Sequence, residues 1–312
     1  MKNKNFISIT DLDAKEIWQI LTLSQKLKKE LKTKRINKPI LKGKTLIMIF
    51  EKPSLRTRLS FETGMTQLGG HAIYLAPADI GLGVREPVGD VAKVASSMGN
   101  IIMARTFKHK TVQDLTQYSS VPVINGLSGL EHPCQILADL LTILEVKGIL
   151  EGLKITYLGD SENNVTHSLA LASALLGINF VTASPKDYWM KSEVVARAKE
   201  MTKKHGGSIS QTDNQEEAVQ DADVVYTDTW VSMGDEAEKE KRLKIFPSYQ
   251  VTQKLMKLAK REAIFMHDLP AYRGNEVQAE VIDGPQSVVF QQAENRLHTQ
   301  KALMVYLMEE AA

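Results

Sequence analysis

The stretch TLIMIFEKPSLRTRLSFETGMTQLGG, from Thr45 to Gly70, is the most informative part of the sequence for predicting the fold. Its first six residues form an apolar run that predicts a buried strand. After a turn, Ser54 stands where a helix N-cap is expected, and the helix runs to the glycine pair. A helix N-terminus presents unpaired N–H groups and the positive end of its dipole, so Arg56, Thr57 and Arg58 in the first turn predict a phosphate site. The two arginines also fit a solvated helix face, and the spacing alone leaves both interpretations open.

Working outward from this unit, short apolar strands and amphipathic helices alternate along the chain. Strands are expected at 45–50, 71–76, 101–105, 121–125, 153–158, 179–183, 208–211, 224–227, 263–267 and 288–291. Helices are expected at 11–32, 54–68, 87–99, 111–118, 133–147, 164–176, 191–205, 215–220, 249–259, 275–282 and 293–309. This alternation predicts an α/β protein of two doubly wound parallel-sheet domains, because the pattern restarts after Gly148. Ligands of such sheets bind beyond the carboxyl ends of the strands.

Composition excludes several classes of protein. The 312 residues carry a net charge of +2 with no basic block, which argues against a nucleic-acid partner. Cys134 is the only cysteine, so an intrachain disulfide is excluded and a reducing compartment is favoured. No apolar stretch reaches the length of a membrane span and the start lacks a signal-peptide pattern, so we expect a cytoplasmic protein without a membrane partner.

Polar side chains follow two further strands of the first half. Arg105 ends the strand 101–105, and His132 and Gln135 flank Pro133, which suits the first position of a helix. An imidazole and an amide can both hydrogen-bond a carbonyl oxygen. Cys134 is either a thiol nucleophile or, as we favour, a packed side chain. One His and one Cys without a second pair are too few for zinc, so we expect neither a metal nor an organic cofactor.

The run Ser54-Leu55-Arg56-Thr57-Arg58 with His132-Pro133-Cys134-Gln135 resembles the carbamoyl-phosphate site of the aspartate/ornithine carbamoyltransferase superfamily, and the resemblance extends over essentially the whole chain. It implies that residues 1–147, joined by the C-terminal helix 291–312, bind carbamoyl phosphate, and that residues 148–290 bind the amino acid. It also implies an active site in the cleft between the two domains. The residues implied to bind carbamoyl phosphate are Ser54, Leu55, Arg56, Thr57, Arg105, His132, Pro133, Cys134, Gln135 and Arg296.

Two segments of the second half resemble the ornithine-specific members of this family. Asn164, in the run GDSENN, matches a residue that binds the amino acid. The run DTWVSMG resembles a loop in which Asp228 binds the α-ammonium and Ser232 and Met233 line the pocket. The charged run 235–242 after it fits either a mobile lid or a solvated helix.

Three positions depart from the family pattern. Gly81 stands where a cross-subunit glutamine is usual, with Arg85 nearby, and Leu55 replaces a threonine. Asp268 takes the place of a substrate-contacting cysteine in the run HDLP, where Asp268 and Leu269 are expected at the ornithine site. A carboxylate there favours the ammonium form of the substrate amine, unless Asp268 acts as its base.

The resemblance implies transfer of a carbamoyl group from carbamoyl phosphate to the δ-amine of L-ornithine, with Arg56, Arg105, His132 and Asp268 as catalytic residues. It also implies a homotrimer. Two alternatives stay open: a carbamoyltransferase for another amine, such as putrescine or an acylated ornithine, and a binding or regulatory protein of the same fold. A dehydrogenase is disfavoured because Gly159 begins no G-x-G-x-x-G run.

Overall fold

The computed structural model describes residues 4–231 and 236–309, and the chain forms two compact units. Unit 1 comprises Met1–Leu141 and Glu294–Ala312, and unit 2 comprises Thr142–Ala293. The chain passes between the units in helix α6 (Pro133–Lys147) and again near the start of helix α13 (Val289–Glu309). Each unit contains one sheet whose strand pairs are all parallel, so the predicted fold class is confirmed.

The sheet of unit 1 has the strand order β2-β1-β3-β4. Its strands are β1 (Thr45–Phe50), β2 (His71–Leu75), β3 (Ile101–Arg105) and β4 (Val123–Leu127). Besides α6 and α13, its helices are α1 (Ala14–Lys34), α2 (Leu55–Gln67), α3 (Pro77–Ile80), α4 (Val88–Met98) and α5 (His109–Tyr118), after a 3₁₀ turn at Ile9–Asp11.

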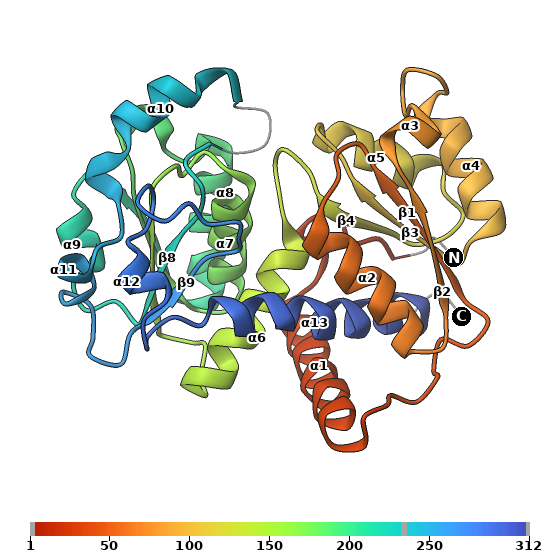
Figure 1. The fold of residues 1–312 in the computed structure, drawn as a ribbon, viewed down its shortest axis with the longest axis horizontal. Helices are drawn as coiled ribbons and strands as arrows, with labels where there is room; N and C mark the ends of the chain where they lie inside the picture. The colour runs from red at the N-terminus through yellow and green to blue at the C-terminus, as the bar shows by residue number, and fades with distance from the viewer. Residues whose placement is uncertain (1–3, 232–235, 310–312) are drawn as a thin grey trace. The chain divides into compact units, whose positions relative to one another are not determined.

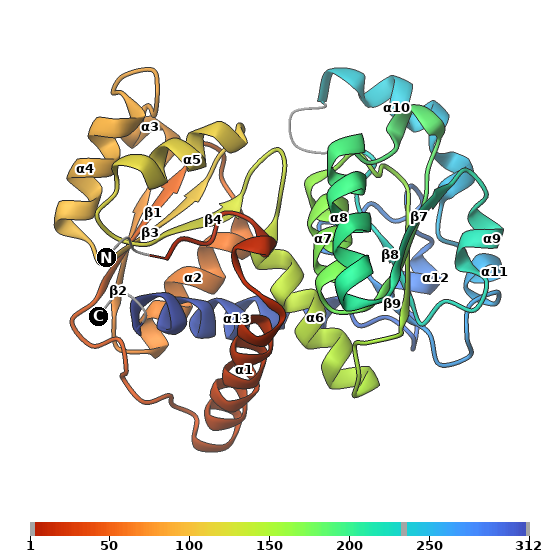
Figure 2. The same cartoon turned by 180° about the vertical axis from the view of Figure 1, so that it is seen from behind.

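Helices cover both faces of this sheet (Figures 1 and 2). Alternate side chains of β1, Ile47 and Ile49, are buried against the apolar sides of α4 and α5. On the other face, α2 and α13 pack side by side, and a Cβ built on Gly64 of α2 would lie 3.1 Å from Lys301 of α13. The sheet is therefore buried on both sides, as continuous apolar strands require.

The sheet of unit 2 has the order β7-β6-β5-β8-β9. Its strands are β5 (Lys154–Leu158), β6 (Asn179–Ala183), β7 (Ser208–Thr212), β8 (Val224–Thr227) and β9 (Ile264–Met266). Its helices are α7 (Asn164–Leu175), α8 (Ser192–His205), α9 (Gln215–Val219), α10 (Lys239–Ile245), α11 (Gln253–Met256) and α12 (Ala279–Ile282). Further 3₁₀ turns lie at Lys186–Tyr188, Glu236–Glu238 and Pro247–Tyr249.

Three predicted elements of unit 2 differ from the structure. The helices predicted at 249–259 and 275–282 are shortened to α11 (Gln253–Met256) and α12 (Ala279–Ile282), because Val251 and Val277 pair as a β-bridge and hold the residues before each helix extended. The predicted strand at 288–291 is the start of α13, and only Ser287 bridges to Phe265 beside β9. In each case a tertiary pairing overrides the local pattern.

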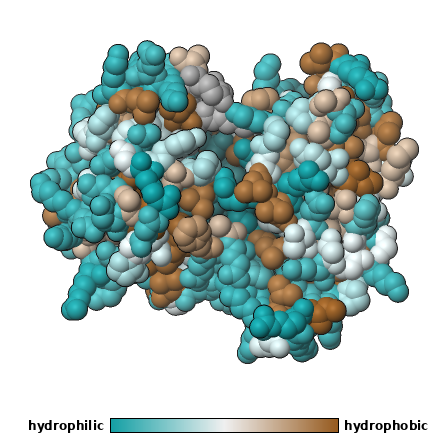
Figure 3. All heavy atoms as spheres, in the orientation of Figure 1, coloured by the Kyte–Doolittle hydropathy of each residue, from teal (hydrophilic) through white to brown (hydrophobic). Residues whose placement is uncertain are grey.

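On the face in Figure 3, hydrophilic residues predominate and apolar residues form small separate groups. Within residues 4–231 and 236–309, no helix combines the length and apolar character needed to cross a membrane.

Lys301 is an unusual component of the core of unit 1. Its side chain is fully buried, and its ammonium donates to the Asn37 Oδ1 (2.7 Å) and the Gln67 Oε1 (2.8 Å), both amide oxygens. Burial lowers the pKa of Lys301 from 10.5 to about 8. The charged form is therefore disfavoured in the folded protein relative to the unfolded chain.

This shift predicts a pH-dependent stability. Between pH 8 and 10.5 the unfolded chain keeps the Lys301 proton while the folded protein loses it, so the free energy of unfolding should rise with pH in that window. Urea unfolding of the wild type and Lys301→Met across this range measures the effect, with Lys26→Met on the exposed side of α1 as control. A constant difference between wild type and Lys301→Met from pH 7 to 10.5 contradicts the prediction.

Candidate functional site

The predicted phosphate-binding residues of unit 1 lie at the carboxyl edge of its sheet. Strands β1 and β3 pair in parallel with Phe50 opposite Arg105, so the turn after β1 and the end of β3 are neighbours. The loop after β4 carries His132 to the same edge, and α6 begins at Pro133 as predicted. Parallel pairing thus brings together side chains that are far apart in the sequence.

The start of α2 is arranged to accept an anion. Ser54 is its N-cap residue, but the Ser54 hydroxyl makes no capping hydrogen bond and instead donates to the Thr57 Oγ1 at 3.1 Å. The backbone N–H groups of the first turn are therefore not occupied by the cap side chain, and Thr57 is buried while Arg56 is partly exposed. Leu55, which is 69% exposed, contributes a backbone N–H to this turn but no hydroxyl.

The structure separates the two arginines of the motif. The Arg58 Nε donates to the Glu62 Oε2 at 2.9 Å, and its guanidinium lies 4.0 Å from the ring centroid of Tyr74. Arg58 is therefore engaged on the outer face of α2 by Glu62 and Tyr74. The charge of Arg56 instead helps to lower the pKa of His132, and the binding of a phosphate by either arginine stays a prediction.

His132 is buried among positive charges. Burial, followed by the charges of Arg296, Arg105 and Arg56, holds the pKa of His132 well below its usual range. The imidazole is therefore neutral near neutral pH, with one N–H donor and one acceptor nitrogen. A neutral imidazole among three guanidinium groups can donate to a carbonyl oxygen while the arginines hold anionic oxygens.

Gln135 and Arg296 are held together in this structure. The Arg296 Nη1 donates to the Gln135 Oε1 at 2.5 Å, and its Nη2 donates to the Thr57 Oγ1 at 3.5 Å. The Gln135 Nε2 donates to the Asp139 Oδ1 at 2.9 Å, which fixes the amide orientation. The Gln135 carbonyl can accept a second hydrogen bond, so it is suited to an amide N–H.

Cys134 is oriented into the protein. The thiol is fully buried and donates to the backbone oxygen of Asn125 at 3.3 Å, and burial raises its pKa to about 12. A thiol in this state is a poor nucleophile, so the structure favours the packed side chain over the nucleophile.

In unit 2, the two asparagines after β5 have different environments. The Asn163 Oδ1 accepts from the Thr166 N–H at 2.8 Å, and the Asn163 Nδ2 donates to the Tyr157 hydroxyl at 2.6 Å. Asn163 is therefore a helix cap, and its side-chain amide is occupied by hydrogen bonds within unit 2. Asn164 is partly exposed at the start of α7, which leaves it the better candidate for a ligand contact.

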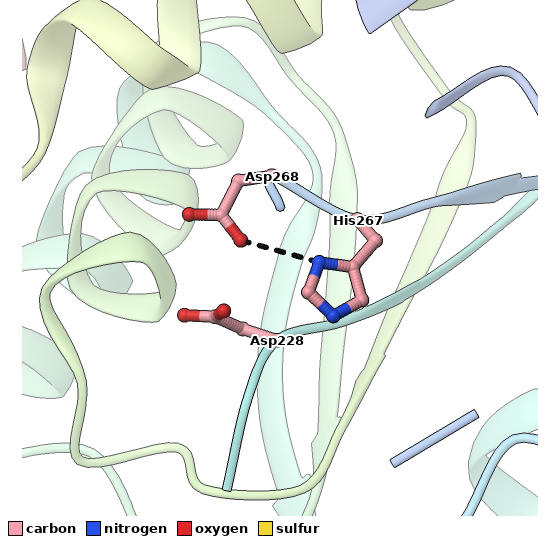
Figure 4. Close-up of side chains that lie close together, drawn as sticks. All are labelled: Asp228, His267 and Asp268. Atoms are coloured by element: carbon pink, nitrogen blue, oxygen red, sulfur yellow. Dashed lines mark ion pairs between the residues drawn. The ribbon is translucent and has the colours of Figure 1, made fainter. Parts of the chain in front are cut away.

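Asp228 and Asp268 follow the neighbouring strands β8 and β9, and their carboxylates face one another beside His267 (Figure 4). One ligand atom from each of the three side chains lies within 4.8 Å of the others. Burial, followed by the charge of Asp268, raises the pKa of Asp228 well above its usual range. Two carboxyl groups this close favour a cation between them.

The imidazole of His267 is engaged by its own surroundings. Its Nδ1 accepts from the Leu269 N–H at 2.9 Å, so the Nε2 carries the proton and donates to the Glu276 Oε1 at 3.2 Å. Burial lowers the pKa of His267, but hydrogen bonds to Asp268 and Glu276 and the charges of Asp268 and Asp228 raise it to about 9. A second proton on Nδ1 requires the ring to exchange the Leu269 N–H for the Asp268 Oδ1, 3.5 Å away.

Arg242 is a buried residue of unit 2 that the sequence did not single out. It ends the charged run 235–242, which fits either a mobile lid or a solvated helix, but it is 5% exposed and its Nη1 lies 2.5 Å from the Asp160 Oδ2. The apolar Leu243, Ile245 and Phe246 after it are the signal that could have shown its helix to be packed. Ser232 and Met233, predicted in the pocket, lie outside the described residues.

Gly81, which replaces the usual glutamine, occupies a special backbone position. It ends α3 in the left-handed conformation (φ +53°), and a Cβ at this position would lie 2.7 Å from the Cβ of Arg85. Arg85 is exposed and pairs with Glu86 at 3.9 Å. The local fold of this loop therefore requires the glycine.

Comparisons with known proteins cover the whole chain. Residues 4–145 match the family model for the aspartate/ornithine carbamoyltransferase, carbamoyl-P binding domain, and residues 151–307 match that for the Asp/Orn binding domain. An ornithine carbamoyltransferase from Caldicellulosiruptor saccharolyticus is 53% identical over 97% of this chain and 98% of its own. One from Archaeoglobus fulgidus is 48% identical over 98% and 97%.

Solved structures of ornithine carbamoyltransferases are also similar to this chain. The structure of ornithine carbamoyltransferase from Pyrococcus furiosus has a TM-score of 0.95 and 48% identity, covering 98% of this chain and 97% of that one. The anabolic ornithine carbamoyltransferase from Campylobacter jejuni has a TM-score of 0.92 and 42% identity, covering 97% and 98%.

Because Gly81 adopts the left-handed backbone conformation, Gly81→Gln should lower the free energy of unfolding by about 1–2 kcal/mol, the usual cost of a left-handed non-glycine residue. Thermal or urea unfolding measures this, with Val84→Gln at the 94%-exposed position of the same loop as control. Equal stability of Gly81→Gln and Val84→Gln contradicts the strain argument.

Proposed function

The chain belongs to the aspartate/ornithine carbamoyltransferase family, and we propose that its two sites serve one reaction. In this reaction the carbamoyl group of carbamoyl phosphate passes to the δ-amine of L-ornithine, giving L-citrulline and phosphate. The protein is thus an enzyme, a carbamoyltransferase. The observation that carries the proposal is the pair of opposite environments: arginines around a neutral histidine in unit 1 and paired carboxylates in unit 2.

Carbamoyl phosphate fits the groups of unit 1. Its phosphate is suited to the N-terminus of α2, with Arg56, Thr57 and the hydroxyl of Ser54. Its carbonyl oxygen is suited to Arg105 and to the neutral imidazole of His132, and its amide to the Gln135 carbonyl. The backbone of Leu55, Pro133 and Cys134 completes this segment, and Arg296 joins Gln135 to Thr57.

Ornithine fits the groups of unit 2. Asp228 is the partner for the α-ammonium, and Asn164 provides an amide for the rest of the amino-acid group. Asp268 adds a second carboxylate, with Leu269 beside it. Ser232 and Met233 belong to this proposal on the family resemblance alone.

The chemistry is acyl transfer without a cofactor. The neutral δ-amine attacks the carbamoyl carbon and forms the C–N bond, and a tetrahedral intermediate carries negative charge on the former carbonyl oxygen. The bond to the phosphate oxygen then breaks, phosphate leaves with the electron pair, and the amine nitrogen loses a proton. We assign the stabilisation of the developing negative charge to Arg56, Arg105 and His132, because both guanidinium groups act electrostatically on the buried imidazole of His132, which keeps an N–H donor.

We further propose a homotrimer, a cytoplasmic location and a role in arginine biosynthesis. All three rest on the family resemblance. Sedimentation equilibrium measures the oligomeric state directly.

The first test is citrulline formation from carbamoyl phosphate and L-ornithine, measured across pH. We expect turnover with ornithine, and loss of about 100-fold or more in kcat for Arg105→Met, a charge-stabilising group. A panel containing putrescine and N-acetylornithine separates the alternatives. Preference for one of these amines supports the sister activity, and calorimetric binding of carbamoyl phosphate without turnover of any amine supports a binding protein.

The second test concerns Asp268. A carboxylate beside the substrate amine stabilises its ammonium form and raises its pKa, so the wild type should reach its maximal kcat at higher pH than Asp268→Cys. Near neutral pH the variant should be the faster enzyme, because more of the bound amine is neutral. Measurements of kcat from pH 6 to 10 for both proteins test this prediction, and superimposable profiles contradict it. A variant that is slower at every pH identifies Asp268 as the base instead.

A further inference from the structure

Arg242 joins three segments of unit 2 through one buried guanidinium. Its Nη1 donates to the Asp160 Oδ2 at 2.5 Å and to the Trp230 backbone oxygen at 3.1 Å. Its Nε donates to the Glu238 Oε2 at 3.2 Å, and the guanidinium lies 5.1 Å from the ring centroid of Tyr188. A buried charge with several directional partners restricts the positions of all of them.

The contact with Asp160 reaches the start of α7. The other carboxylate oxygen of Asp160 accepts from the Glu162 N–H at 2.9 Å, and its backbone oxygen accepts from the Asn163 Nδ2 at 3.0 Å. Asn163 in turn caps α7 through the Thr166 N–H. The turn that presents Asn164 is thus built on Asp160.

The contact with Trp230 reaches the segment after β8. Trp230 lies two residues beyond Asp228, and its ring stacks on Phe246 at a centroid distance of 6.0 Å, directly after α10. A Cβ on Gly159 would lie 3.4 Å from the same indole ring. Helix α10 therefore holds Trp230 by its ring and by its carbonyl.

We propose that Arg242 is a positioning residue for the amino-acid substrate, because it sets the separation between Asn164 and Asp228. The inference rests on the proposed function of these two residues as ornithine ligands. Arg242 acts through Asp160 and Trp230 rather than on the substrate itself. A lysine keeps a charge for Asp160 but has a single nitrogen, so it cannot donate to Asp160 and Glu238 from two separate positions as the Nη1 and Nε of Arg242 do.

The test compares Arg242→Met and Arg242→Lys with Arg273→Met. Arg273 is the matched control because it also holds a carboxylate, Asp283, through two hydrogen bonds (2.8 and 2.6 Å), but on the exposed surface. For Arg242→Met we expect the KM for ornithine to rise about tenfold or more, since hydrogen bonds to charged groups are worth about one to two powers of ten. The calorimetric affinity for carbamoyl phosphate, which binds other residues, should be unchanged. Arg242→Lys should fall between wild type and Arg242→Met.

A second measurement is independent of turnover. Amide hydrogen exchange of residues 160–164 should be faster in Arg242→Met than in Arg273→Met, because the Glu162 N–H depends on the orientation of Asp160. If the wild type forms no citrulline, the proposed function is overturned. The role of Arg242 in positioning residues 160–164 is then tested by the hydrogen-exchange comparison alone. An unchanged ornithine KM in a folded Arg242→Met, or unchanged exchange in residues 160–164, overturns the inference. Equal losses in ornithine and carbamoyl-phosphate binding also overturn it, since they indicate general destabilisation.

Discussion

Parallel pairing at the middle of each sheet is the constraint on which the rest of the structure depends. Strand β1 lies between β2 and β3, and β5 lies between β6 and β8. From each of these central strands the chain first adds strands on one side and then crosses over to add strands on the other side. At such a switch point the loops beyond the carboxyl ends diverge and leave room for a ligand. The turn after β1 and Arg105 meet at the first of these points, and the loops after β5 and β8 meet at the second.

Each unit contains a buried histidine, and the two histidines have pKa values shifted in opposite directions. In unit 1, burial and three arginines depress the pKa of His132, so an imidazole that often carries charge is neutral there. In unit 2, carboxylates surround His267 and raise its pKa. Both histidines are buried, and the sign of the neighbouring charges decides the difference. The cationic site suits a phosphate group and the anionic site suits an ammonium group, which are charged groups of the two proposed substrates.

Local patterns predicted most elements of the fold because strand and helix periodicities are properties of consecutive residues. The helix 133–147 has the predicted bounds, since Pro133 at its first position and Gly148 after its end are local signals. Local signals overestimated the length of the helices at 249–259 and 275–282, where the pairing of Val251 with Val277 leaves only α11 and α12 helical. They also failed at Arg242, whose charged neighbours are typical of a solvated helix although its own side chain is buried.

The amino-acid sequence alone was sufficient to predict the alternation of strands and helices, the parallel character of both sheets and the family to which the chain belongs. Each of these depends on spacing and motif, which can be read along the chain. Only the tertiary structure decided which side chains of a motif face the site. It assigned Arg58 to Glu62 and Tyr74, Asn163 to its own loop and Gly81 to a left-handed turn. These assignments depend on partners far away in sequence or on a backbone angle, and neither is a property of the residue type alone.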